Sequence, residues 1–415
     1  MINTLKSTRL LTSSVSPSPS SLLPLSLSLR EMAVLKVMCL FLYALMMHDA
    51  QKANGAFSAE TQKMMDEANK NGPYVGLVIP NLFEMNPLLQ SPSFTSSNFT
   101  IDFAGIISKK SQSYIVFPLS LCLLVFSSSH GCFQGRRFRF GTIAEKEVIL
   151  VMTGLGMINA GITTQLLLSL FNIEGVVHYG TAGNLNPSLR IGDVTIPQYW
   201  SHTGLWNWQR YGQGPDDELA LEEDGDYTRE IGYLKFANYT ANVTNCINYD
   251  NLLNNAWYQP EEIFPIDGTP EEREHIFWVP VDTRYFEISK RLEGLELERC
   301  LNETTCLSKT PKVATVLRGT SASIFVANIA YRSFIYGKFN VTALDMESAS
   351  VALICHQQRV PFIAFRALSG GVSAESSDAA KFISLAAKNS VTVVVEFIKQ
   401  LSANQALIKS FPPEE

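Results

Sequence analysis

The stretch EVILVMTGLGMINA, residues 147–160, decides the fold of this chain. It begins with a continuous aliphatic run, Glu147–Met152, which is typical of a strand covered on both faces of a sheet. Gly154 and Gly156 follow the strand, and a helical pattern opens at Asn159. A dinucleotide site needs a third glycine at that position and an acid ending the next strand, and the sequence has neither. The two glycines instead predict a close approach of the backbone to a small anion or hydroxyl at a helix N-terminus.

Strands and helices alternate on both sides of this stretch. Further strands are predicted at Tyr74–Ile79, Gly175–Tyr179, Asp193–Pro197, Val313–Leu317 and Phe362–Phe365. Helices are predicted at Ala59–Lys70, Asn159–Leu170, Ala343–Gln357 and Asp378–Leu401. Parallel neighbours need crossover connections, and a helix fits into most of these intervals. The alternation therefore predicts an α/β domain with a mainly parallel sheet.

The charge pattern and the histidines argue against two classes of function, nucleic-acid binding and metal binding. The chain has 415 residues, of which 46% are hydrophobic and 17% charged, and its formal net charge is −6. It has no block of five or more lysines and arginines, so we expect no surface that follows nucleic-acid phosphates. The six histidines form no metal cluster. We expect His178 to be a satisfied core residue, and His202 either to line the mouth of a pocket or simply to pack.

Residues 1–55 are interpreted as a leader that ends in a signal peptide. The apolar run Val37–Met47 follows a single early cation and is about half as long as a membrane span. Small residues suit cleavage near Ala53-Asn54-Gly55. Residues 1–31 make an unusually long n-region, so either translation begins at Met32, which we favour, or this stretch is a transit-like leader.

Sequons and cysteines agree with the secretory pathway and an extracellular or vacuolar destination, with no membrane segment after signal removal. Five N-x-S/T sequons occur, at Asn98, Asn238, Asn242, Asn302 and Asn340. Cys300 and Cys306 bracket a short loop and are placed to close a small disulfide in an oxidising compartment. Cys246 is either free or competes for one of them, and Cys355 is expected to be a buried small hydrophobe.

A single domain is predicted over residues 56–415, with two insertions. The first, 106–135, contains an apolar run without periodicity that Pro118 interrupts and that is too short to span a bilayer. Two explanations stay open. It is either a retained intron, as its pyrimidine-rich codon composition suggests, or a real hydrophobic excursion that would aggregate if exposed. Its removal joins residues 101–105 to 136–140 as two strands of a hairpin.

The second insertion covers about residues 210–308. It holds an acidic run from Asp216 to Asp226, whose order does not match a calcium-binding EF-hand loop. We expect a solvated acidic loop there. Further along, Asp282 is placed to cap a helix whose apolar face begins at Tyr285.

Two more motifs adjoin predicted strands. Gly180-Thr181-Ala182-Gly183 ends a strand, where small residues with exposed N–H groups can cradle a sugar or a base edge. A plain tight turn explains this tetrapeptide equally well. Asp345-Met346-Glu347 begins a helix after a strand-like segment. Its thioether and carboxylate suit a ribose, whereas the glutamate alone would also suit a helix start.

Five segments in fixed order carry a resemblance to a known family. They are Thr153–Ala160, Tyr179–Gly183, Leu189–Val194, Leu344–Ala349 and Val360–Ser369. In this order they resemble the nucleoside phosphorylase superfamily, especially its methylthioadenosine/S-adenosylhomocysteine nucleosidase branch and the plant bark or vegetative storage proteins. The resemblance covers about residues 74–401 outside the two insertions. It implies a three-layer α/β/α sandwich around a central mixed, mostly parallel sheet.

The resemblance also implies roles for single residues. Met346 and Glu347 match the ribose-binding pair, and Glu84, after the first strand, matches a water-activating glutamate. The other substrate-binding positions are Gly154 and Gly156 near the nucleophile or phosphate, Thr181, Ala182 and Gly183 beside the base and sugar, and Phe325 at the base-stacking position. The implied ligand is a purine nucleoside or purine base, with phosphate as a further candidate. No cofactor or metal is implied, and the implied assembly is a homo-oligomer.

One position departs from the active members of this family. They place an aspartate that protonates the purine N7 where this chain has Gly370. General acid catalysis typically contributes about 10²- to 10⁴-fold. Two hypotheses therefore stay open. The first is an enzyme that cleaves an N-glycosidic bond with Glu84 activating water and with impaired acid catalysis. The second is a non-catalytic storage or ligand-binding protein that holds an adenine-like base such as a cytokinin.

Overall fold

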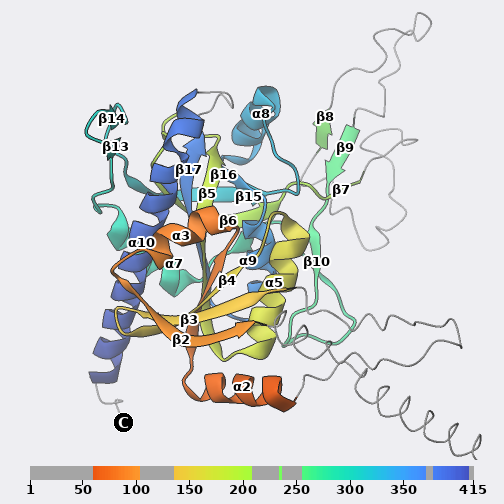
Figure 1. Ribbon diagram of the computed structural model, residues 1–415. Coiled ribbons are helices and arrows are strands. Elements are labelled where there is room, and N and C mark those ends of the chain that lie inside the picture. Colours follow the sequence, from red (N-terminus) through yellow and green to blue (C-terminus); the bar gives the residue numbers. More distant parts are fainter. Residues whose placement is uncertain (1–58, 103–134, 208–232, 236–254, 371–376, 411–415) are drawn as a thin grey trace, which may run out of the picture. The chain divides into compact units, whose positions relative to one another are not determined.

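The computed structural model describes residues 59–102, 135–207, 233–235, 255–370 and 377–410 (Figure 1). The expected leader and signal peptide, nearly all of the first insertion, the acidic run and Cys246 lie outside these residues. In the part of the chain that the structure describes, no helix combines the length and the apolar character needed to cross a membrane.

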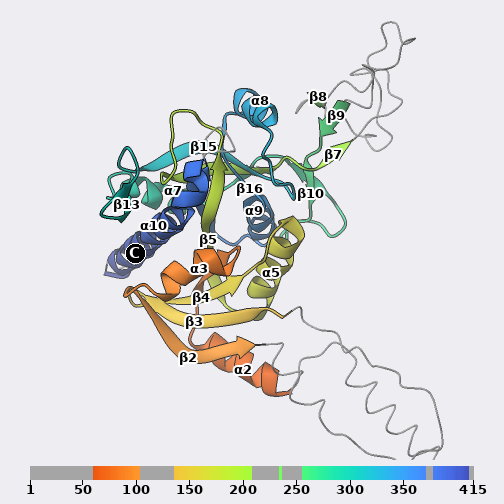
Figure 2. The ribbon, with the colours of Figure 1, turned by 45° about the horizontal axis from the view of Figure 1, so that its top comes forward.

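A ten-stranded mixed sheet forms the centre of the domain (Figures 1 and 2). Its strands are β1 (Tyr74–Ile79), β2 (Phe94–Asp102), β3 (Arg137–Ile143), β4 (Lys146–Met152), β5 (Ile173–Asn184), β6 (Val194–His202), β12 (Val279–Pro280), β15 (Val313–Ser321), β16 (Val341–Asp345) and β17 (Phe362–Gly370). The order is β12-β6-β15-β16-β5-β1-β4-β3-β2, and β17 pairs with β5 and β6. The expected mixed sheet is confirmed. Among the described strands, five of its pairings are parallel and five antiparallel.

Helices cover both faces of this sheet, as expected for an α/β/α sandwich (Figure 2). On one face α5 (Met157–Leu170) packs against α9 (Ser348–Gln357). On the other face α10 (Ser377–Ser410) packs against α3 (Leu82–Leu89) and α7 (Thr283–Ser289). Two further helices, α2 (Ala59–Lys70) and α8 (Ile329–Phe339), lie at the periphery.

The central strands are buried on both faces, which explains their continuous aliphatic sequences. Every residue of β1 is buried between β4 and β5. In β17 the ring of Phe365 packs on Phe397 of α10, with 5.1 Å between the ring centroids. The strands that the sequence predicted therefore form the core, and polar side chains collect where these strands end.

The structure corrects the start of one predicted helix and decides between two interpretations of one motif. Both segments lie next to the candidate site. The helix predicted over Ala343–Gln357 begins only at Ser348, because residues up to Asp345 form the buried strand β16 between β15 and β5. The tetrapeptide Gly180–Gly183 is not a turn. It continues β5 as far as Asn184 and pairs with β17.

The two strands on either side of the first insertion form an antiparallel pair. This confirms the predicted hairpin for residues 101–102 and 137–140, while residues 103–105 lie outside the described part of the chain. Asp102, the last residue of β2, lies directly opposite Arg137, the first residue of β3. The chain thus leaves and re-enters the sheet at adjacent positions. The origin of the intervening segment stays a prediction.

The later part of the expected 210–308 insertion contributes to the main domain. β12 pairs with β6, and Tyr285 and Ile288 of α7 belong to the central core. Asp282 caps α7 as predicted, because its carboxylate accepts a hydrogen bond from the Tyr285 N–H. The smaller elements of this region are β7 (Trp206–Asn207), β8 (Tyr233–Lys235), β9 (Asn255–Tyr258), β10 (Glu261–Ile263), β11 (Glu274–Ile276) and the 3-10 helix η2 (Lys290–Leu292).

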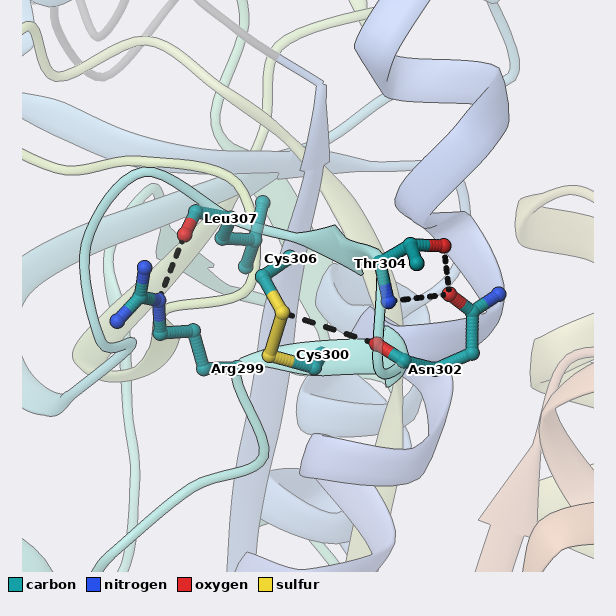
Figure 3. The surroundings of a disulfide bond; sticks show 6 residues. All are labelled: Arg299, Cys300, Asn302, Thr304, Cys306 and Leu307. Carbon is teal, nitrogen blue, oxygen red and sulfur yellow. Dashed lines mark hydrogen bonds between the residues drawn. A yellow bond between two sulfur atoms is a disulfide. The ribbon is translucent and has the colours of Figure 1, made fainter.

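The expected disulfide between Cys300 and Cys306 is present (Figure 3). It joins the short strands β13 (Cys300–Asn302) and β14 (Thr305–Cys306). Asn302, a sequon residue, is exposed in this hairpin, and its side-chain oxygen accepts hydrogen bonds from the backbone and hydroxyl of Thr304. Cys355 is fully buried, as the sequence predicted.

Candidate active site

Glu84 lies at the start of α3, just beyond the end of β1, and its side chain is only 2% exposed. Its Oε1 accepts hydrogen bonds from the backbone N–H and the hydroxyl of Thr181, at 2.6 and 2.9 Å. Its Oε2 accepts one from Asn81 Nδ2 at 2.9 Å, and Asn81 caps the helix. Burial raises the pKa of Glu84, and the nearby Arg366 charge opposes that rise. Strand β5 and helix α3 therefore hold one carboxylate between them, and its pKa lies above that of a free glutamate.

The glycine loop after β4 adopts backbone conformations that favour glycine. Gly154 and Gly156 have φ values of +80° and +93°. The N–H of Gly156 donates to Glu347 Oε1 at 2.9 Å, and the N–H of Met157 donates to Ser323 Oγ at 3.1 Å. Side chains from two other strand ends thus satisfy the N-terminus of α5, which has no side-chain cap of its own.

Asp345 ends β16, Glu347 stands two residues later before α9, and both are buried. Asp345 Oδ1 accepts hydrogen bonds from the N–H groups of Glu347 and Ser348, which ends the strand and starts α9. Burial and the Asp345 charge raise the pKa of Glu347 to about 7, against the lowering effect of Arg366. Glu347 is consequently a carboxyl that changes charge near neutral pH.

Arg366 is fully buried in β17 and lies among the carboxylates. Its Nε lies 2.6 Å from Asp345 Oδ2 and donates to Ser348 Oγ at 2.8 Å. Its Nη2 lies 4.0 Å from Glu347 Oε2 and also contacts the Nε2 of His178. One guanidinium therefore lies among several acids. Burial is the main reason that the pKa values of Glu84 and Glu347 rise, the Asp345 charge adds to the rise, and Arg366 opposes it.

Gly180 leaves room for this network. A Cβ atom at this position would lie 2.5 Å from Arg366 Nη1 and 2.7 Å from Glu84 Oε1. Neither side chain can withdraw easily, since both are almost completely buried. Strand β5 therefore needs a glycine where Arg366 and Glu84 approach each other.

Most of the residues that the sequence analysis selected come together around these acids. Glu84 contacts Thr181, and Glu347 contacts Gly156, so direct hydrogen bonds join these four residues in two pairs. The half-buried members of the predicted set are Gly154, Gly156, Thr181, Gly183 and Met346, while Ala182 is buried. This arrangement places partly exposed backbone and side-chain groups beside two buried carboxylates.

Three predicted positions lie at the margin of this cluster. Phe325 is 84% exposed, and its loop is connected to α5 by the contact between Ser323 and Met157. Gly370, at the end of β17, pairs with Gly183. His202 ends β6, where its Nδ1 lies 2.5 Å from Glu261 Oε1.

Sequence reasoning assigned no site role to Arg366 and treated His178 as a satisfied core residue. The burial of His178 is confirmed, but its partners include the site arginine. A usable signal was present for Arg366, which interrupts the apolar strand Phe362–Leu368, since a charged residue in such a strand needs buried partners. No comparable signal identified His178, because its role depends on a contact between distant strands.

The chain belongs to the phosphorylase superfamily, whose family model matches residues 125–399. Its relatives include bark storage protein A of Populus deltoides, 30% identical over 269 residues, which are 64% of this chain and 78% of that protein. A 5′-methylthioadenosine/S-adenosylhomocysteine nucleosidase of Bacillus cytotoxicus is 27% identical over 271 residues, 64% of this chain and 87% of the enzyme. The resemblance inferred from the sequence is confirmed at the level of the superfamily and of these relatives.

Solved nucleosidase structures also align with the chain. A mutant Helicobacter pylori enzyme with 5′-methylthioadenosine in its active site gives a TM-score of 0.46 at 16% identity, covering 79% of this chain and 99% of that one. The Neisseria meningitidis enzyme in complex with methylthio-immucillin-A gives 0.45 at 19% identity, covering 79% and 98%.

Proposed function

We propose that this protein binds a purine nucleoside or purine-like base at the cluster around Glu84 and Glu347, and that it cleaves the N-glycosidic bond slowly or not at all. In this proposal Glu347 and Met346 hold the ribose, and Thr181, Ala182 and Gly183 lie beside the base and sugar. Gly154 and Gly156 lie near the water or phosphate, and Phe325 stacks on the base. The observation that carries the proposal is that Glu347 reaches the Gly156 loop while Glu84 reaches Thr181.

The placement of Glu84 supports a role in activating water. Its carboxylate is fixed by Thr181 and Asn81, and burial raises its pKa toward the range in which a general base works well. A purine leaving group also needs a proton. Gly370 supplies no acidic side chain at the position where the resemblance leads us to expect an aspartate. This absence favours binding with weak cleavage over efficient turnover.

A second candidate function is non-catalytic storage or base binding, for example of a cytokinin. It is favoured by Gly370 together with the 30% identity to bark storage protein A.

We also propose, from the signal peptide and the sequons, a glycoprotein of the secretory pathway with an extracellular or vacuolar destination. The Cys300–Cys306 disulfide supports an oxidising compartment. A homo-oligomer is proposed from the family resemblance, and light scattering of the purified protein tests it.

The test uses the purified protein with adenosine, inosine and 5′-methylthioadenosine, with and without phosphate. Calorimetry measures binding, and chromatography measures the release of free base. We expect binding that Glu347→Gln weakens and that Glu262→Gln, a change at an exposed glutamate, leaves unchanged. Failure to bind any nucleoside or purine base overturns the proposal. Turnover as fast as that of active nucleosidases overturns the assignment of impaired catalysis.

A further inference from the structure

Both ring nitrogens of the buried His178 have partners, and these partners fix its tautomer. Nδ1 lies 2.7 Å from the carbonyl oxygen of Val78, which can only accept, so Nδ1 carries the hydrogen. Nε2 contacts Nη2 of Arg366, which can only donate, so Nε2 accepts. The imidazole is therefore neutral. Burial and the Arg366 charge agree with this, since both lower the pKa of His178 well below its ordinary value.

The sheet register makes this contact possible. Val78 on β1 lies opposite His178 on β5, and Gly180 lies opposite Arg366 on β17. His178 and Gly180 are two residues apart on one strand, so they share a face, and the arginine extends across it toward the histidine. His178 thus connects β1 to the arginine of the site through a single ring.

Arg366 is consequently held at two points of its guanidinium. Nε is held by Asp345 and Ser348, and Nη2 by His178. From that position Nη2 lies 4.0 Å from Glu347 Oε2, which is beyond hydrogen-bonding distance. Glu347 instead uses Oε1 to accept from the N–H of Gly156.

We propose that His178 is a positioning residue that, by accepting a hydrogen bond from Nη2, keeps the Arg366 guanidinium out of direct contact with Glu347. Without this acceptor, the buried Nη2 N–H loses its partner, and Glu347 Oε2, 4.0 Å away, is a carboxylate oxygen that can replace it. A closed ion pair would occupy one oxygen of the carboxylate that the proposed function assigns to the ribose. The effect on ligand binding rests on that proposed function, whereas the placement of the guanidinium does not.

The ionisation of Glu347 reports this placement in the ligand-free protein. The charged groups that face Glu347 are Asp345 from β16, Arg366 from β17 and Glu84 from α3, and His178 adds a neutral ring from β5. A shorter distance to Arg366 stabilises the carboxylate, so the pKa of Glu347 falls from about 7 when the guanidinium moves closer.

The experiment compares His178→Leu, which has no acceptor, with His178→Gln, whose amide oxygen can replace Nε2. Infrared titration of the carboxyl groups, assigned by the signal that Glu347→Gln removes, measures the pKa of Glu347. We expect the leucine variant to lower this pKa by about one unit or more, and the glutamine variant to keep it near the original value. His356→Leu, at the far end of α9, is the control for the loss of a histidine. An unchanged pKa in the leucine variant, or an equal fall in both variants, overturns the proposal.

Two further measurements keep the proposal testable if the leucine variant does not fold and separate it from the proposed function. Nitrogen-15 NMR of the unmodified protein should show His178 neutral, with the hydrogen on Nδ1, through pH values where a free histidine is protonated. Protonation of His178 near its ordinary pKa overturns the proposal. Adenosine should bind about tenfold more weakly to His178→Leu than to His178→Gln. If the unmodified protein binds no nucleoside, the proposed function fails, and the carboxyl titration still decides the role of His178.

Discussion

Glu347 Oε1 accepts a hydrogen bond of 2.9 Å from the backbone N–H of Gly156, 191 residues earlier in the chain. This contact joins the first turns of α9 and α5. It is also the point where the ribose-binding residue proposed here meets the glycine loop after β4.

The ionisation of Glu347 should make stability depend on pH. A glutamate ordinarily has a pKa near 4.5, and the pKa of Glu347 is about 7. Between these values the folded protein holds a proton that the unfolded chain has released, so the free energy of unfolding falls as pH rises through this window. Glu347→Gln should reduce the fall between about pH 5 and about pH 7.5 by on the order of 1–3 kcal/mol. Urea denaturation at the two pH values measures this, and an identical fall in both proteins contradicts the prediction.

Gly180 should be intolerant of even one added carbon. Gly180→Ala places a Cβ 2.5 Å from Arg366 Nη1 and 2.7 Å from Glu84 Oε1, and should lower the free energy of unfolding by about 1–3 kcal/mol. Gly370→Ala is the matched control, because a Cβ there meets no atom within 4 Å. Thermal and urea unfolding compare the two variants. Equal stability of both variants would show that the network accommodates the added carbon without a loss of stability.

Restoring an acid at Gly370 should raise the rate of N-glycosidic cleavage. The open space around a Cβ at this position accepts a side chain, and a general acid typically contributes about 10²- to 10⁴-fold. We expect Gly370→Asp to release adenine from 5′-methylthioadenosine about 10²-fold faster than the unmodified protein. Gly370→Asn, which has the same shape but no acidic proton, should not. Equal rates in the two variants would exclude general acid catalysis as the missing element.

The segment between β2 and β3 should be dispensable for folding. Deletion of residues 103–134 leaves Gly135-Arg136 between the paired residues Asp102 and Arg137. A two-residue loop with glycine first is a favoured hairpin connection, and Gly135 already has a positive φ. We expect the shortened protein to be at least as stable as the full chain in thermal unfolding, and to aggregate less. Replacing the segment with a Gly/Ser linker of equal length is the control. Loss of folding in the deletion alone would show that the segment is structural.

The sequence predicted the parts of this fold that depend on local pattern. β1 and α2 have the predicted bounds, and the hairpin around the first insertion pairs as expected. The first turn of the helix predicted from Ala343 is wrong, because residues 343–345 form a strand with neighbours on both sides in the sheet. Sequence periodicity does not reveal those partner strands.

The candidate site was predictable where motifs follow strands. Glu84, Gly156, Thr181 and Glu347 were chosen by resemblance, and the structure joins them in pairs through hydrogen bonds. The contact between Arg366 and His178 was not predictable, because it depends on the register between β5 and β17. Such a register is fixed by the whole sheet and by no short stretch of sequence.

Glu347 connects ligand binding to the stability of the fold. One carboxyl group accepts the N–H at the start of α5 and also faces the place where a ligand is expected, so a ligand that draws it away leaves the N–H of Gly156 without this partner. A substitution of Glu347 should therefore change both the affinity for a ligand and the stability of the fold.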